Sequence, residues 1–144
     1  MTRRRVAGFA FVFAAVIACS GTTAPTPSSL AGTWTLHTVN GTSLPFTITL
    51  RRGSRPTELH VLSGAIVIRE NGTWAEQLTL RQIQGSADST GTNADSGTYQ
   101  IRGESISFDK YEPPVSEFDH RIATTNGDKI LLPTFPLFLV YKKR

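Results

Sequence analysis

The chain has 144 residues, a length typical of a single domain, with 15 basic and 11 acidic residues and a formal net charge of +4. Its single cysteine excludes an internal disulfide. The basic residues form only short clusters, so the composition argues against a nucleic-acid-binding protein.

The first 18 residues are typical of a secretory signal. Arg3, Arg4 and Arg5 supply a positive start, and the apolar run 6–18 follows them. That run is shorter than the roughly 20 residues that a transmembrane helix needs. When such a signal is removed, three arginines leave with it, so that 12 basic residues face 11 acidic ones and the net charge falls to +1.

The apolar run ends at Val16-Ile17-Ala18-Cys19. This tetrapeptide resembles the lipobox of bacterial lipoproteins, in which a branched apolar residue, a variable residue and a small residue precede a cysteine. The resemblance implies that the chain is cut before Cys19 and that fatty-acylated lipid on this cysteine holds it on a cell-envelope membrane. Ser20, where an aspartate would cause inner-membrane retention, implies the outer membrane in a Gram-negative cell. The alternative is an ordinary signal peptide that contains a cysteine by chance.

The residues that follow Cys19 are small, polar and proline-containing, which predicts a flexible linker. The expected organisation is therefore a lipoprotein signal peptide at 1–18, a lipidated cysteine and linker at 19–29, and a folded domain at 30–144. A domain of this size buries enough surface to fold without a disulfide.

In the folded domain, apolar and polar residues alternate repeatedly with a period of two, which predicts half-buried β-strands. Asn40-Gly41, Asn71-Gly72 and Asn126-Gly127 predict hairpin turns because Asn and Gly accept positive φ at little cost. Eight or nine short strands joined by such turns predict an all-β antiparallel meander that closes into a barrel. The residues expected to face inward are Phe46, Ile48 and Leu50; Trp74, Leu78 and Leu80; Tyr99 and Ile101; Ile106 and Phe108; and Phe118, His120 and Ile122.

Two segments interrupt this pattern. Residues 84–96 contain no large apolar side chain and predict the tip of a hairpin. Residues 110–117 contain Pro113-Pro114, which cannot donate hydrogen bonds to a ladder and predicts a strand break. Each is a candidate binding loop, with a tolerated surface excursion as the simpler interpretation.

Gly32-Thr33-Trp34 opens the first predicted strand. It resembles the Gly-x-Trp start of lipocalin-like domains, and residues 97–108 resemble a strand-turn-strand unit of the same group. In that superfamily a basic residue near the last strand covers the tryptophan ring, a role that the resemblance gives to one of residues 142–144. Such a cation–π contact contributes about 0.5–2 kcal/mol. The implied fold is a small lipocalin-like barrel, although the domain is shorter than a typical lipocalin and lacks its helix and its later motifs.

Two functional hypotheses stay open at this point. In the first, the barrel binds a small apolar molecule. In the second, the barrel is filled by its own side chains and serves as a cell-envelope interaction or inhibitor-type scaffold for a protein partner that the sequence does not identify. The candidate ligand-lining residues of the first hypothesis are Trp34, Phe46, Trp74, Tyr99, Phe108, Phe118 and His120.

The sequence carries no signature of an enzyme. It contains no Gly-x-Ser-x-Gly, no His-Glu-x-x-His and no phosphate-binding loop. His37, His60 and His120 fall on different predicted strands, so we expect no metal site and no cofactor. Glu76 and Gln82 share the parity of their apolar neighbours, so each is expected either to face inward with a partner or to lie at a barrel rim, because an unpaired buried polar group costs about 1–3 kcal/mol.

Overall fold

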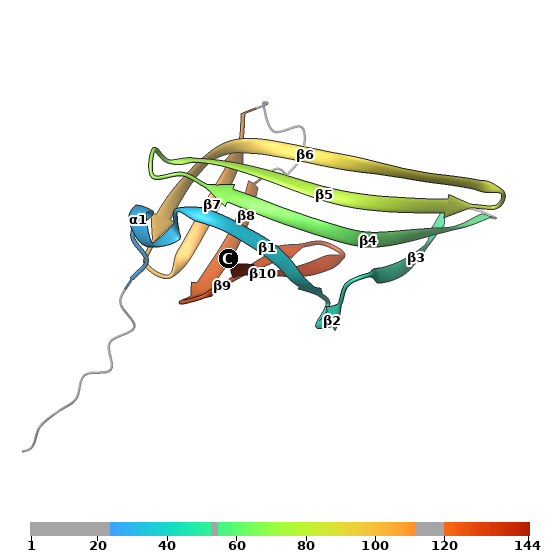
Figure 1. Cartoon of the computed structure of the whole chain (residues 1–144), viewed down its shortest axis with the longest axis horizontal. Helices are drawn as coiled ribbons and strands as arrows, with labels where there is room; N and C mark the ends of the chain where they lie inside the picture. Colours follow the sequence, from blue (N-terminus) through green and yellow to red (C-terminus); the bar gives the residue numbers. More distant parts are fainter. Residues whose placement is uncertain (1–23, 53–54, 112–119) are drawn as a thin grey trace, which may run out of the picture.

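The computed structural model describes residues 24–52, 55–111 and 120–144 (Figure 1). The predicted signal peptide, Cys19, Pro113-Pro114 and Phe118 lie outside these residues, as does the side chain of His120. The elements are α1 (Pro27–Leu30), β1 (Gly32–Val39), β2 (Thr42–Ser43), β3 (Phe46–Arg52), β4 (Arg55–Ile68), β5 (Thr73–Gln84), β6 (Ala87–Arg102), β7 (Ser105–Lys110), β8 (His120–Asn126), β9 (Lys129–Thr134) and β10 (Leu137–Lys143).

The strands form one antiparallel sheet that closes on itself. Strands β4 to β10 follow one another in chain order, β10 pairs with β1, and β1 pairs with β4. This makes an eight-stranded barrel, to which β2 and β3 add one strand each beside β1 and β4. The expected all-β, lipocalin-like meander is confirmed, and the described residues form ten strands in place of eight or nine.

The predicted turns lie between consecutive strands. Asn40 and Gly41 have φ values of 50° and 78° and join β1 to β2, a conformation that asparagine and glycine adopt most readily. Gly72 and Gly127 also have positive φ, in the turns before β5 and β9. The hairpin prediction is thus confirmed at all three Asn-Gly pairs.

The hydrophobic core lies inside the barrel, and residues from every barrel strand contribute to it. Each of its members is at most 7 % exposed. The members are Leu30, Trp34, Leu36, Val39, Val61, Ile66, Ile68, Trp74, Tyr99, Ile106, Phe108, Ala123, Ile130, Leu132, Leu139 and Tyr141.

Beyond the barrel, four strands continue as an open sheet that we call the arm. It consists of β3 with the outer ends of β4, β5 and β6, at residues 46–52, 55–61, 80–84 and 87–91. Figure 1 shows the arm extending to the right, away from α1. The strands therefore form a closed barrel near α1, while the outer ends of β4, β5 and β6 form an open sheet with β3.

Three expectations differ from the structure. Residues 84–96 belong mostly to β6, and their turn is confined to residues 85–86, because β5 pairs with β6 along its whole length. In β8 the inward residues are Arg121 and Ala123, whereas Ile122 is 53 % exposed, so the inward placement of Ile122 was wrong. Pro27–Leu30, partly inside the expected linker, forms the short helix α1.

Candidate functional site

A tryptophan contact joins the two ends of the folded domain. Trp34 on β1 lies opposite Lys143 on β10, and Lys143 Nζ is 5.5 Å from the centroid of the Trp34 ring. The same Nζ donates to the carbonyl oxygen of Ser29 over 2.6 Å, and Trp34 Nε1 donates to that of Leu30 over 2.8 Å. The expected cation over this ring is therefore confirmed, and it is Lys143. We call this set of contacts the latch.

Three aromatic candidates lie together inside the barrel. The rings of Trp74 and Phe108 meet edge to face with centroids 5.3 Å apart, and Tyr99 lies 6.4 Å from Phe108. Trp74 Nε1 donates to the carbonyl oxygen of Thr98 over 2.9 Å, and the Tyr99 hydroxyl donates to that of Arg69. Burial raises the pKa of Tyr99. The polar atoms of this group are thus satisfied by the protein itself.

A buried charged group lies beside these rings. Arg121 Nη1 donates to one carboxylate oxygen of Glu76 over 2.6 Å, and the Tyr141 hydroxyl donates to the other over 2.5 Å. The Arg121 guanidinium lies 4.8 Å from the Trp74 ring centroid. Burial, followed by the Glu76 charge, raises the pKa of Tyr141. We call Glu76, Arg121 and Tyr141 the buried triad.

Sequence reasoning found only part of this triad. Glu76 was expected either to face inward with a partner or to reach a rim, and the structure buries it with partners. Arg121 was missed because the apolar neighbour Ile122 set the wrong parity for β8. The available signal was the inward acid itself, because a buried carboxylate requires a cation or hydrogen-bond donors.

The barrel interior leaves no room beside its largest aromatic side chains. Trp34, Trp74 and Phe108 have 0 % accessible surface, and Tyr99 has 7 %. A side chain without accessible surface borders no void that admits a water molecule. Phe46 lies apart from these four, on β3 in the arm, and is half-buried. The candidate lining residues whose side chains the structure describes therefore divide into packed core residues and one arm residue.

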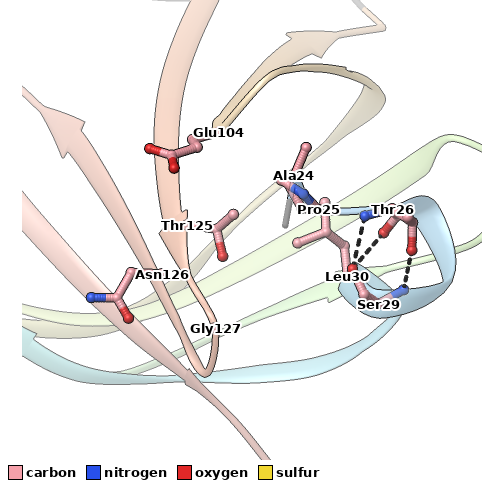
Figure 2. Close-up of a pocket in the computed structure, with 9 residues that line it drawn as sticks. All are labelled: Ala24, Pro25, Thr26, Ser29, Leu30, Glu104, Thr125, Asn126 and Gly127. Carbon is pink, nitrogen blue, oxygen red and sulfur yellow. Dashed lines mark hydrogen bonds between the residues drawn. The ribbon is translucent and has the colours of Figure 1, made fainter. Parts of the chain in front are cut away.

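A shallow groove of about 580 Å³ lies outside the barrel, beside α1 (Figure 2). Its walls are α1 with the preceding residues on one side, and the turns after β6 and β8 on the other. The Thr26 and Ser29 side chains cap α1, and Thr125 Oγ1 donates to the carbonyl oxygen of Lys129. The lining residues are Ala24, Pro25, Thr26, Ser29, Leu30, Glu104, Thr125, Asn126 and Gly127.

The arm carries an apolar strip on the face that continues from the barrel interior. Ile48 lies opposite Leu59 across β3 and β4, and both are half-buried, as is Leu50. Phe46 and Leu80 pack against the barrel core, whereas this strip extends beyond it. The other face of the arm is mostly polar, with a hydrogen bond between the side chains of Thr47 and His60. The arm is therefore amphipathic.

The described residues provide no cluster of three or more metal-ligating side chains. His37 is exposed on β1, and His60 bonds with Thr47 in the arm. Within the same part of the chain, no helix combines the length and apolarity that crossing a bilayer requires.

No known family model matches the chain, and no curated protein matches it significantly. A functional assignment therefore has to be argued from the residues and their geometry.

Proposed function

We propose that this chain is a lipid-anchored cell-envelope protein whose filled barrel is a rigid scaffold, and that its arm presents a surface to a protein partner. The proposal for the anchor rests on the sequence, because the basic start, the apolar run and Val16–Cys19 occur in the order that a lipoprotein signal requires. The proposal for the scaffold rests on packing.

The observation that carries the scaffold role is the zero accessible surface of Trp34, Trp74 and Phe108. These residues would have to line the pocket of a ligand-carrying barrel, and such a pocket leaves part of its lining accessible when empty. The buried triad supports the same conclusion, because its carboxylate is already bonded to Arg121 and Tyr141. An internal ligand would have to displace well-packed core side chains, at a cost in stability.

The arm is the part of the molecule best suited to a partner. It presents Ile48, Leu50 and Leu59 on a sheet face that the barrel core does not reach. In addition, β3 lies at one end of the strand order, so that its outer backbone groups are available for pairing with an added strand. Apolar side chains and strand pairing together favour an extended protein segment as the partner.

The anchor is tested by replacing its cysteine. Cys19→Ser should abolish incorporation of a fatty-acid analogue and leave an uncut precursor. As a matched control, Ser20→Ala should leave both labelling and cleavage intact. Unchanged labelling of the Cys19→Ser chain would contradict the anchor.

The scaffold role is tested by comparing a ligand with a partner. The lipidated protein is extracted with organic solvent for mass spectrometry, and a photo-crosslinking amino acid is placed at Leu50 in the arm or at Thr124 on the barrel exterior in living cells. We expect no stoichiometric small molecule, and one recurrent cross-linked protein from position 50 that Ile48→Glu removes. A stoichiometric apolar molecule in the extract would contradict the filled scaffold and favour the ligand carrier.

A further inference from the structure

One end of the eight-stranded barrel carries α1 together with the turns that connect alternate pairs of strands. Strands β4, β6, β8 and β10 finish there, and β1, β5, β7 and β9 begin there. This end, which we call the anchor end, consists of α1, residues 69–72, 102–104 and 126–129, and the final residues 142–144 (Figure 1).

The attachment of α1 brings this end close to the proposed lipid. Leu30 is buried in the core, and Lys143 fixes Ser29 through its carbonyl oxygen. The described chain begins at Ala24, only five residues after Cys19. Five residues span at most about 18 Å. A lipid on Cys19 therefore holds the anchor end, and not the arm, next to the bilayer.

The charges of the molecule are distributed unevenly along the same axis. The anchor end has six basic and three acidic residues, whereas the rest of the described residues has six basic and five acidic residues. All nine charged side chains of the anchor end are exposed or half-exposed. The basic ones are Arg69, Arg102, Lys129, Lys142, Lys143 and Arg144, and the acidic ones are Glu70, Glu104 and Asp128.

From this placement we infer that the anchor end docks on the anionic headgroups of the membrane that carries the lipid on Cys19. The inference rests on the proposed lipid anchor and extends it, because a lipid alone fixes position but not orientation. Basic residues near an anionic surface are attracted within about a Debye length, roughly 8 Å at physiological salt. The end with the larger net positive charge faces the lipid, so the barrel stands on its end.

The orientation determines where the arm is presented. Strand β6 runs from Ala87 in the arm to Arg102 at the anchor end. Its sixteen residues span about 50 Å at the rise of an extended strand. Docking of the anchor end therefore holds the tip of the arm away from the headgroups, by at most this length because barrel strands are tilted, where a partner within the envelope can reach it.

The test uses two positions on this one strand. Gln100→Cys and Thr90→Cys are exposed sites near the two ends of β6, and each is labelled with a fluorophore in the lipidated full-length mature protein. The protein is reconstituted into vesicles of phosphatidylcholine with 30 % phosphatidylglycerol and a headgroup quencher. We expect at least threefold stronger quenching at position 100 than at position 90.

The charge requirement has its own matched controls. Arg102→Glu with Arg144→Glu turns the net charge of the anchor end from positive to negative, and should reduce quenching at position 100 at least twofold. Arg51→Glu with Arg81→Glu makes the same change of charge in the arm and should leave that quenching unchanged. Vesicles without phosphatidylglycerol should give the same reduction as the anchor-end variant.

The two proposals fail in different ways. A purified chain without lipid mass overturns the proposed anchor, and the orientation falls with it. A lipidated chain whose two positions are quenched equally, or whose quenching is the same in neutral vesicles, overturns the docking inference alone.

Discussion

Two arginine–carboxylate pairs with similar N–O distances lie in different regions of this molecule. Arg121 and Glu76 meet over 2.6 Å inside the barrel with side chains 6 % and 3 % exposed, whereas Arg81 and Asp88 meet over 2.5 Å in the arm with side chains 44 % and 47 % exposed. Water and salt compete with the arm pair, so its net contribution is small. Inside the barrel both charges are buried, so each depends strongly on the other.

The largest expected effect follows from breaking the inner pair. Glu76→Ala leaves the Arg121 charge buried without a counter-ion and should lower the free energy of unfolding by about 3–5 kcal/mol. Urea unfolding followed by the fluorescence of Trp34 and Trp74, both buried, measures the change. Asp88→Ala in the arm is the control, and its unfolding midpoint should stay within experimental error of the parent's.

A second pair of variants separates charge from packing in the triad. Replacing both partners, as in Glu76→Leu with Arg121→Met, removes both buried charges and should recover most of the stability lost in Glu76→Ala. A double variant as unstable as the single one would mean that shape, and not charge, distinguishes the barrel pair from the arm pair.

Two glycines of β6 allow the packing of the barrel and of the arm to be compared. The expected change in the free energy of unfolding is somewhat smaller than for the inner ion pair. A Cβ on Gly97 would lie 1.8 Å from the backbone oxygen of Asp109, whereas a Cβ on Gly91 in the arm would meet nothing within 4 Å. Gly97→Ala should therefore lower the free energy of unfolding by about 3 kcal/mol, the upper end of typical overpacking costs. Gly91→Ala should be neutral or slightly stabilising. Equal effects would show that the backbone near Gly97 yields without cost.

The sequence predicted the barrel well because its signals there are local. Alternating apolar residues and Asn-Gly turns determine which strands form and where they reverse. The contact of Trp34 with the last strand was implied by the resemblance of Gly32-Thr33-Trp34 to the lipocalin start. The same reasoning missed the first ten residues of β6, because residues 87–96 carry no apolar alternation. That segment is a strand because β5 supplies its hydrogen bonds, and such a partner cannot be found from composition.

The buried triad shows a different limit. Glu76, Arg121 and Tyr141 come from three strands, and only the closed barrel brings them together. An inward arginine also reverses the apparent parity of β8, because its exposed neighbour Ile122 is the more apolar residue. Local patterns therefore predict core positions reliably only where the core is apolar.

Alkaline pH should destabilise the barrel more than the arm. The folded-state pKa of Tyr141 is raised above its ordinary value of 10 by burial and by the Glu76 charge. The stability that Tyr141 contributes is thus fully present below pH 10 and is lost as the pH rises further, because only the unfolded chain ionises there. The slope approaches about 1.4 kcal/mol per pH unit for this one group.

The control for this slope is Tyr141→Phe, which should flatten it. Tyr99, whose pKa burial also raises, leaves a weaker dependence in the variant. In the arm, Arg81 lowers the pKa of Asp88, and the contribution of Asp88 is instead lost on the acid side, as the pH falls below about 4. A Tyr141→Phe variant with the parent's alkaline slope would contradict the role given to the triad.

The latch lies between the buried triad and the exposed arm charges in its exposure to solvent. Breaking it should have the smallest effect on the free energy of unfolding. The ammonium group of Lys143 is exposed like the arm charges, but its partner ring, Trp34, is buried like the barrel triad. A cation–π contact of this kind contributes about 0.5–1 kcal/mol. Lys143→Ala should lower the free energy of unfolding by about that amount, while Lys142→Ala, one residue away and not over the ring, should change it less.

Two further measurements test whether the cation of Lys143, rather than its apolar stem, accounts for this difference in the free energy of unfolding. Lys143→Arg keeps a cation above the ring and should retain most of the stability, whereas Lys143→Met keeps the apolar stem alone and should not. Hydrogen exchange at Leu30 and Ala31 should quicken in Lys143→Met, because α1 loses the bond from Lys143 to Ser29. If all three Lys143 variants match the parent, burial of Trp34 and Leu30 alone holds α1, and an exposed charge matters as little at the anchor end as in the arm.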